Sequence, residues 1–363
     1  MCDEKLKRYK DRYKEWSVFS LFEKMRQNFI SKNEKKQQAQ LLDTAKVTVV
    51  IPFYNRANYI KEAIESVFNQ TYENWKLILV DDGSTDDYIS QIKDFLEDPR
   101  VKLQRLGQNV GQSKALNSGL DLVETPYLIQ LDSDDWFYPH TLEILVNEAD
   151  KQPNDVAVIS GNIQITHEDE NGNRILTEVY KNRQFKDKYD FLLSNTSVWP
   201  RFYRTSSLRF VGGWPTDDPY EGRYLEDKRI LHKLIEHFRF YWMDQMLYNQ
   251  RFHKDSHSRN VEKYAEVEEW TVRDSLKRWG DEYEPVMETF GLGWKRVNYI
   301  ISKNSEGHPN KLTLQSSSKM PENQQHATNQ FTNLNNLSGA PGTGPGTGPG
   351  TGPGTGPGTG PGT

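Results

Sequence analysis

The sequence predicts an α/β fold with a Rossmann-like, mostly parallel sheet and helices on both faces. From Lys46 onward, short runs rich in β-branched residues alternate with segments of helical spacing about ten to twelve residues long, the pattern of βαβ units. Three of the apolar runs end in polar or acidic clusters. Ligands bind at the carboxyl ends of strands in open α/β sheets, so these clusters predict a site at that edge.

The first half of this region is regular. The run VTVVI at 47–51 predicts a buried strand, and 59–68 has apolar residues at helical spacing. The further predicted strands are 75–80, 101–106 and 127–131, and the further predicted helices are 85–96 and 112–123.

The second half is less regular. A hairpin is expected over 163–179, because Asn171-Gly172 favours a tight turn between two apolar runs. The predicted helices here are 142–150, 185–193 and 224–238, and the predicted strands are 156–160, 197–203 and 240–248.

Both ends of the chain differ from this pattern. Residues 1–45 are basic with helical spacing, which predicts a helical extension packed on the main domain or on a second subunit; a helix lying on an anionic membrane is the alternative. Residues 258–303 hold two helical patterns and predict a helical C-terminal extension. Residues 304–363 are Ser/Asn/Gln-rich and then repeat PGTG, which predicts disorder; the period of four excludes a collagen helix.

Composition excludes several classes of protein. The 363 residues carry a net charge of −5, which disfavours a general nucleic-acid binder. With Cys2 as the single cysteine, neither an intrachain disulfide nor a cysteine metal site can form. No run reaches the roughly 18 apolar residues that span a bilayer, and no signal core begins the chain, so we expect a cytoplasmic protein.

The three polar strand ends suggest a nucleotide site. Parallel strands bring Pro52-Phe53-Tyr54-Asn55, Asp81-Asp82-Gly83-Ser84 and Asp132-Ser133-Asp134 to one edge. An aromatic ring can stack on a nucleobase, a carboxylate can accept a ring N–H, and an acid pair can hold Mg²⁺ or Mn²⁺ on phosphates. The acids of LDSDDW at 131–136, taken alone, equally suit a helix N-terminus.

Neither GxxxxGK[ST] nor a GxGxxG after the first strand is present, which argues against P-loop and dinucleotide-binding proteins.

Residues 46–257 resemble a family 2 glycosyltransferase of the GT-A fold. The matching segments occur in the family's order: VTVVIPFYNR, ESVFNQTYENWKLILVDDGSTDD, NVGQSKALNSGL, TPYLIQLDSDDWFYP, VGGWP and YLEDKRIL. The resemblance implies a nucleotide-sugar donor, a divalent metal, either Mn²⁺ or Mg²⁺, and inversion at the anomeric carbon. It divides the domain into a nucleotide-binding half, 46–136, and an acceptor half, 137–257.

The resemblance also implies roles on the donor side. Tyr54 would stack on the base, and Asp82 would bind its pyrimidine edge, with Asp81 either assisting or only shaping the turn. The metal positions would be Asp134, Asp132 and His253, with Asp132 alternatively on the ribose. The remaining donor-binding positions would be Pro52, Asn55, Gly111, Lys114, Asn117 and Ser133, with Asn109 at the start of the same loop. Lys114 could instead be solvated, and Asn117 could only brace its loop. Asp135 is interpreted as a helix-capping acid and His257 as polar surface.

On the acceptor side the resemblance makes Asp227 the general base. Glu226 and Trp214 would contact the acceptor, with Trp214 as a sugar platform. Ordinary acidity at a helix N-terminus is the alternative for Asp227, and packing inside a loop is the alternative for Trp214.

The expected activity is transfer of a sugar from a UDP- or dTDP-sugar to a hydroxyl of a glycan, lipid or protein acceptor, with a metal stabilising the departing diphosphate. Two other classes remain open. A sugar-phosphate nucleotidyltransferase would need a glycine-rich basic loop after the first strand, where this chain has Phe53-Tyr54-Asn55-Arg56. A non-catalytic sugar-binding relative would not need the acids at 132, 134 and 227. Peripheral membrane contact or dimerisation through residues 1–45 is a further expectation.

Overall fold

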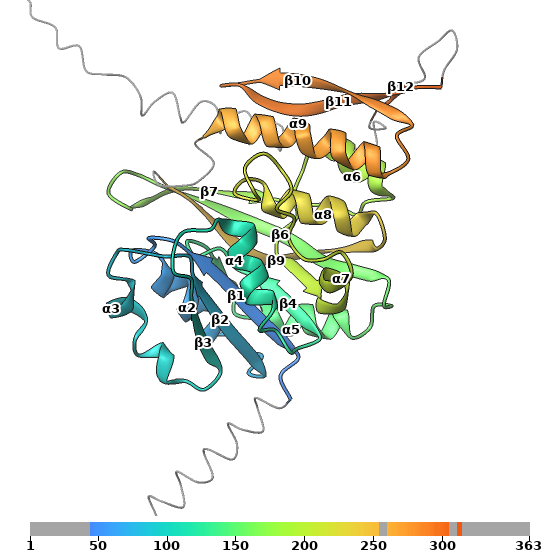
Figure 1. Cartoon of the computed structure of the whole chain (residues 1–363). Helices are drawn as coiled ribbons and strands as arrows, with labels where there is room; N and C mark the ends of the chain where they lie inside the picture. Colours follow the sequence, from blue (N-terminus) through green and yellow to red (C-terminus); the bar gives the residue numbers. More distant parts are fainter. Residues whose placement is uncertain (1–43, 254–259, 305–310, 314–363) are drawn as a thin grey trace, which may run out of the picture. The chain divides into compact units, whose positions relative to one another are not determined.

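The computed structural model describes residues 44–253, 260–304 and 311–313 (Figure 1). The predicted N-terminal helix, the PGTG repeats and the interpretation of His257 lie outside these residues and stay predictions. None of the helices in the described ranges is both long and apolar enough to cross a bilayer.

The main sheet contains nine strands of the described chain, in the order β3-β2-β1-β4-β8-β6-β9-β5, with β7 paired to β6 (Figure 1). The strands are β1 (Val47–Phe53), β2 (Trp75–Asp81), β3 (Val101–Arg105), β4 (Tyr127–Gln130), β5 (Trp136–Phe137), β6 (Val156–Glu168), β7 (Arg174–Tyr180), β8 (Arg201–Arg204) and β9 (Arg239–Phe252). The helices are α2 (Ile60–Phe68), α3 (Tyr88–Ile92), α4 (Gln112–Leu120), α5 (Thr141–Ala149), α6 (Lys188–Ser194), α7 (Thr205–Phe210), α8 (Glu226–Ile235) and α9 (Val261–Arg278).

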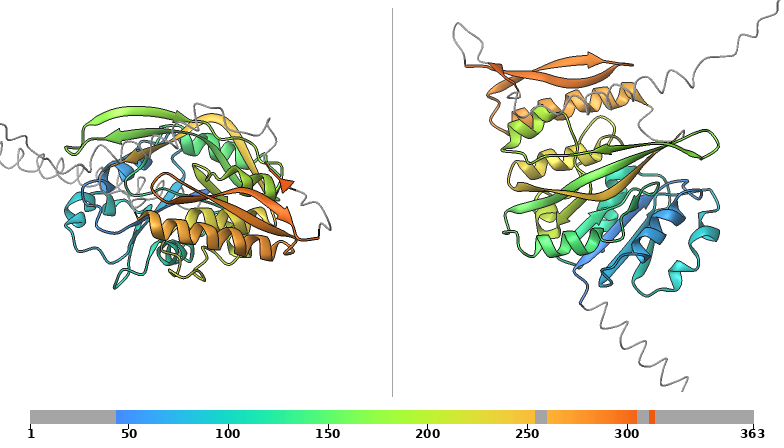
Figure 2. Two further views of the ribbon diagram at one scale, coloured as in Figure 1. Left: turned by 90° about the horizontal axis from the view of Figure 1, so that it is seen from above. Right: turned by 180° about the vertical axis from the view of Figure 1, so that it is seen from behind.

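The first four strands are parallel, as predicted. Every residue of β1 is buried, because helices cover both faces of the sheet. The helix α4 packs against β1 and β2 on one face, and α2 and α5 lie on the other face in the view from behind (Figure 2). Phe53 at the end of β1 is in register with Asp81 at the end of β2, so both polar segments leave the sheet at one edge.

Antiparallel pairing begins beyond β4. The strand β8 runs antiparallel to β4 and places Arg201 opposite Gln130. The strand β9 runs parallel to β6 and antiparallel to the short β5, where Trp136 faces Asn249. This return of the chain brings the end of β9 next to the segment that follows β4, so residues far apart in sequence meet there. The hairpin predicted over 163–179 is present as β6 and β7.

The C-terminal extension is only half helical. After α9 the chain forms β10 (Tyr283–Phe290) and β11 (Trp294–Ser302), joined by β12 (Lys311–Leu312) in a second sheet that packs on α9 (Figures 1 and 2). The prediction of a second helix was therefore wrong, as was disorder at 311–312. Pro285 and β-branched residues disfavour a helix here, and Gly291 and Gly293 take positive φ values of 54° and 112° at the turn.

Two further boundaries differ from the prediction. The helix expected over 85–96 is split into α3 and a 3₁₀ turn at Phe95–Glu97, with the side chain of Asp87 accepting from the Ser90 amide at the start of α3. The strand expected over 197–203 begins only at Arg201, one residue after Pro200, which lacks an amide proton for the sheet.

The close packing of α4 on the sheet depends on Gly119. A Cβ added there would lie 2.7 Å from Cγ1 of Val50 and 3.2 Å from Cγ2 of Val80. We predict that Gly119→Leu lowers the free energy of unfolding by about 1–3 kcal/mol through overpacking, measured by urea denaturation. Gly107→Ala is the matched control, because nothing lies within 4 Å of its added Cβ. Equal denaturation midpoints for wild type and Gly119→Leu would contradict this packing.

Candidate active site

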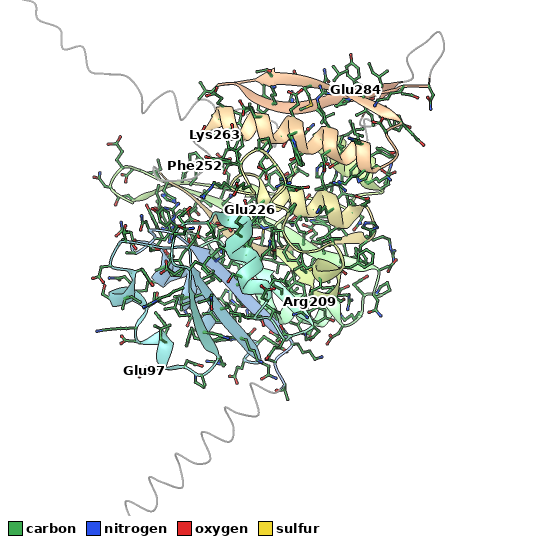
Figure 3. All side chains as sticks on the ribbon, viewed as in Figure 1. Glu97, Arg209, Glu226, Phe252, Lys263 and Glu284 are labelled. Carbon is green, nitrogen blue, oxygen red and sulfur yellow. The ribbon has the colours of Figure 1, made fainter. Side chains whose placement is uncertain are left out.

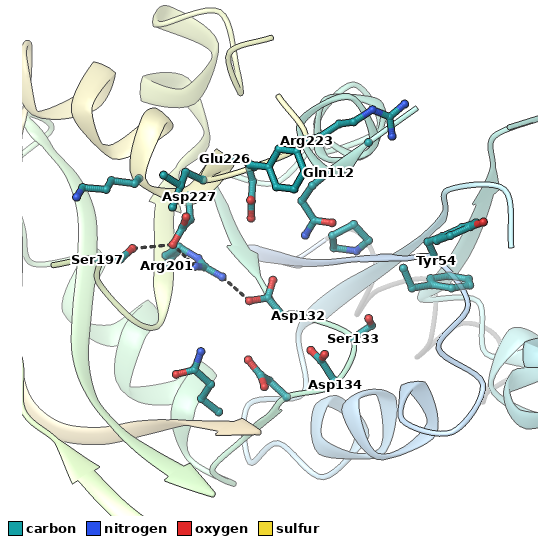
Figure 4. Close-up of a pocket in the computed structure, with 18 of the residues that line it drawn as sticks. Tyr54, Gln112, Asp132, Ser133, Asp134, Ser197, Arg201, Arg223, Glu226 and Asp227 are labelled. Carbon is teal, nitrogen blue, oxygen red and sulfur yellow. Dashed lines mark hydrogen bonds and ion pairs between the residues drawn. The ribbon is translucent and has the colours of Figure 1, made fainter. Parts of the chain in front are cut away.

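A cavity of about 440 Å³ opens at the carboxyl ends of the parallel strands (Figure 4). Nine residues predicted for the site line it: Pro52, Tyr54, Asp82, Gly111, Asp132, Ser133, Asp134, Glu226 and Asp227. Five predicted residues do not line it: Asn55, Lys114, Asn117, Trp214 and His253. The cavity therefore brings together the ends of β1, β2 and β4 and the start of α8.

The turn after β1 presents Tyr54 and uses Asn55 as a brace. Tyr54 is 39% exposed at the cavity. Asn55 adopts a left-handed φ of 53°, and its side-chain oxygen accepts a 2.8 Å hydrogen bond from the Thr85 amide. Its own amide donates to the Ser84 hydroxyl at 3.0 Å. Asn55 thus holds two strand-end loops together and does not itself line the cavity, and its contact with the donor stays a prediction.

The two acids after β2 have separate partners. Asp81 accepts hydrogen bonds of 2.7 Å from the Ser84 amide and from the Tyr88 hydroxyl, so it shapes the turn. Asp82 accepts from the amides of Val110 and Gly111 at 2.7 and 2.9 Å. Burial raises the pKa of Asp82 despite these two hydrogen bonds. Asp82 therefore orders the loop before α4, and each of its oxygens keeps a second acceptor position for a ligand.

Trp214 lies in the core. It is 1% exposed and packs edge-on against Tyr203, with ring centroids 5.7 Å apart. Asn117 donates to its carbonyl and accepts from its amide, both at 2.8 Å. The predicted sugar platform is therefore wrong for Trp214, because its ring is covered by protein, and Asn117 braces the Gly-Gly-Trp loop. Lys114 forms an ion pair with Glu221 outside the cavity.

Asp134 lies between two cationic or protonatable groups. Its Oδ2 is 3.0 Å from Nε2 of His253 and 3.7 Å from Nε of Arg56. Burial opposes its ionisation, but the hydrogen bond from His253 and the charge of Arg56 lower the pKa of Asp134. The carboxylate is therefore ionised at neutral pH, and His253 reaches it because β9 ends beside the segment after β4.

Asp135 has a structural role different from the predicted helix cap. It is 3% exposed, is followed by β5, and accepts hydrogen bonds of 2.8 Å from the Tyr248 hydroxyl and the Arg251 amide. Burial and the charges of Asp134 and Asp132 raise its pKa well above the usual range. Asp135 therefore ties the acid segment to β9.

Arg201 is the site residue that sequence reasoning missed. It is 2% exposed, and its guanidinium lies 2.7 Å from Oδ2 of Asp132 and 3.0 Å from Oδ2 of Asp227 (Figure 4). Ser197 donates to the same oxygen of Asp227 at 2.8 Å. The sequence signal for this residue was the arginine within WPRFYR. It begins β8, and β8 lies between β4 and β6 in the sheet, which buries the arginine.

Glu226 and Asp227 begin α8 after Leu225, which turns the chain with a left-handed φ of 52°. Burial, with the charges of Asp227 and Asp132, raises the pKa of Glu226 to about 8. Glu226 therefore keeps its proton at neutral pH, whereas Asp227 accepts from a guanidinium. The two adjacent acids lie in different environments and suit different tasks.

The described residues contain no group of three or more His, Cys, Asp or Glu that could hold a metal alone. Of the predicted metal positions, Asp134 lines the cavity, and Nε2 of His253 lies 3.0 Å from its Oδ2. Mg²⁺ is usually bound through one or two carboxylates, with waters and substrate phosphates completing its shell. The donor set therefore fits an ion that binds together with a diphosphate. Asp132, also predicted as a metal position, instead forms an ion pair with Arg201.

Comparison with known proteins gives a family match over part of the chain. Residues 48–212 match the family described as Glycosyl transferase family 2. The glycosyltransferase GlyA of Streptococcus pneumoniae is 30% identical over 231 residues, covering 59% of this chain and 32% of GlyA. An uncharacterized glycosyltransferase of Rickettsia bellii is 43% identical over 105 residues, or 29% of this chain and 15% of the relative. The chain thus spans a third or less of these relatives' lengths.

A solved structure supports the fold. The crystal structure of S. aureus TarS 1–349 in complex with UDP-GlcNAc matches with a TM-score of 0.50 and 20% identity, over 64% of this chain and 66% of that one. The predicted GT-A type fold is thereby confirmed.

The raised pKa of Glu226 predicts a pH-dependent change in stability for Glu226→Gln. The unfolded glutamate ionises near its ordinary pKa of 4.5, but the folded one ionises near 8. Wild type therefore loses stability relative to the variant as pH rises through this interval. We expect the melting temperature of Glu226→Gln to exceed that of wild type increasingly from pH 4.5 to 8.

Glu124→Gln is the control for this experiment. Lys76 lowers the pKa of Glu124 at the surface, so this variant should show a small difference of the opposite sign. A difference between Glu226→Gln and wild type that does not vary with pH would show that Glu226 ionises normally.

Proposed function

We propose that this chain is an inverting glycosyltransferase that moves a sugar from a nucleoside diphosphate sugar to an acceptor hydroxyl. The observation that carries the proposal is that one cavity is lined by the nucleotide-side residues and by the carboxylate pair of α8. Arg201 joins the two groups through Asp132 and Asp227. A donor and an acceptor bound in this cavity would meet between these acids.

On the donor side, Tyr54 would stack on the base and Asp82 would accept the N3–H of uracil or thymine. The loop that Asp82 orders ends in Gly111, which precedes α4 and lines the cavity. Asp134 and His253 would hold Mn²⁺ or Mg²⁺. When bound there, the ion supplies Lewis-acid stabilisation of the departing diphosphate, so no carboxylic acid is needed to protonate it.

On the acceptor side, Asp227 would take the proton of the attacking hydroxyl. The hydroxyl oxygen forms a bond to C1 of the sugar as the bond from C1 to the diphosphate oxygen breaks. Both side-chain hydrogen bonds that Asp227 accepts among the described residues go to Oδ2, so Oδ1 would be the oxygen that takes the proton. Glu226, protonated at neutral pH, can donate a hydrogen bond to a second oxygen of the acceptor molecule.

The other two classes have less support. A nucleotidyltransferase would need a basic glycine-rich loop after β1, but the turn here is Tyr54-Asn55-Arg56 and is braced by the loop after β2. A purely sugar-binding relative would have no need for the ion pairs that orient Asp227 at the cavity.

Donor choice tests the proposed function directly. In the presence of Mn²⁺, we expect UDP and dTDP to bind more tightly than GDP or ADP by calorimetry, because Asp82 accepts a ring N–H of uracil or thymine. Nucleotide release from the matching sugar nucleotides should follow the same order. Preference for a purine diphosphate would refute the assignment of Asp82, and no release from any sugar nucleotide would refute the transferase.

A pair of variants separates chemistry from donor binding. Asp227→Asn keeps the shape but cannot take a proton, so kcat should fall about 10²- to 10⁴-fold with nearly unchanged affinity for the nucleotide. Asp134→Asn should also weaken Mn²⁺-dependent binding of the nucleoside diphosphate. Rates come from initial-velocity assays and affinities from calorimetry. If Asp227→Asn keeps most of its kcat, the base is another group, with Glu226 the next to test.

A further inference from the structure

The acceptor side of the cavity carries aromatic rings supplied from outside the family-matched residues 48–212. These are Tyr224 before α8, Tyr264 on α9 and Trp294 at the start of β11, and we call them the aromatic wall. All three are partly exposed. Their ring centroids form a series, 5.4 Å from Tyr224 to Tyr264 and 5.7 Å from Tyr264 to Trp294. The half-helical extension therefore completes the cavity.

The aromatic wall lies next to the acids of α8. The start of α9, labelled at Lys263, lies over the start of α8, labelled at Glu226 (Figure 3). Burial and the charges of Glu226 and Asp227 raise the pKa of Tyr264, which reflects the same proximity. An acceptor that contacts the wall can therefore place a hydroxyl at Asp227.

The charges around the aromatic wall favour a neutral ligand. Among the cations that line the cavity in the described chain, Arg201 is paired with two aspartates and Lys228 is paired with the buried Glu268. Arg223, beside Tyr224, also lines the cavity and donates hydrogen bonds to Asn109 of the nucleotide-side loop. The acidic side chains of Glu226 and Asp227 also line this side of the cavity, and neither carries a positive charge. A phosphorylated acceptor at the wall would have to approach the Asp227 carboxylate, while Arg201 and Lys228 are already neutralised by their ion pairs, which is unfavourable at low dielectric.

We propose that the aromatic wall is the acceptor subsite and that the acceptor is a neutral sugar residue. A pyranose has an apolar C–H face, which loses water favourably on aromatic rings, and a rim of hydroxyls that need polar partners. The apolar face would stack on Trp294 and Tyr264. The hydroxyls would form hydrogen bonds with Glu226 and Asp227. The inference rests on the proposed function, and it replaces the platform predicted at Trp214 with one from the C-terminal extension.

The test is binding of methyl glycosides to the full chain saturated with UDP and Mn²⁺. Saturation-transfer difference NMR with methyl glucoside, galactoside and N-acetylglucosaminide gives the Kd of each. We expect at least one of them to bind, and Trp294→Ala to raise its Kd about tenfold, because a desolvated aromatic contact is lost. Trp294→Phe should keep most of the affinity. Affinity for UDP should be unchanged in both variants.

Phe290→Ala is the matched control. Phe290 faces Trp294 across the β10–β11 hairpin and is partly buried, but it does not line the cavity. We expect this variant to bind the glycoside like wild type. If Phe290→Ala and Trp294→Ala weaken binding equally, hairpin stability explains the loss and the subsite is refuted.

Other results would also overturn the inference. Unchanged glycoside affinity in Trp294→Ala, or binding of glycerol 3-phosphate in preference to every neutral glycoside, would reject a neutral sugar at the wall. Absence of glycoside binding while UDP binds normally would reject the subsite alone. Absence of UDP binding would instead count against the proposed function, so the two failures can be told apart.

Discussion

The arrangement of the site depends on one buried cation. Arg201 is removed from water and is held by Asp132 at the end of β4 and by Asp227 at the start of α8. A buried guanidinium without partners would cost several kcal/mol, so its ion pairs fix the distance between the two acids. The parallel half of the sheet and the later helical layer are thus joined at the point where a donor and an acceptor would meet.

The surrounding polar contacts mainly hold loops in place. Asn55 joins the turns after β1 and β2, Asp82 orders the loop before α4, and Asn117 holds the chain at Trp214. Each of these side chains forms its hydrogen bonds to backbone groups of a different segment, which resists movement of one loop against another. The carboxylates and aromatic rings at the cavity are thereby positioned before any ligand binds.

The sequence predicted the strand ends well because hydrophobic runs and turn residues are local signals. The parallel strands and the cavity positions of Tyr54, Asp134 and Glu226 follow from them. It could not predict Arg201, because its burial depends on pairing between strands far apart in sequence. The exposure of Trp214 was misjudged for the same reason, since a ring in a glycine-rich loop can face the core or solvent. The hairpin after α9 was taken for a helix because its apolar residues fit either period.

Two separate parts of the chain supply the lining of the cavity. The nucleotide-side residues come from strand ends of the matched region, whereas Tyr264 and Trp294 come from α9 and β11. Substitutions in the β10–β11 hairpin can alter the shape of one wall while the hydrogen bonds that order the opposite wall stay intact. In the proposed transferase, the choice of acceptor can therefore change through substitutions in α9, β10 and β11, while the residues that would act on the donor stay the same.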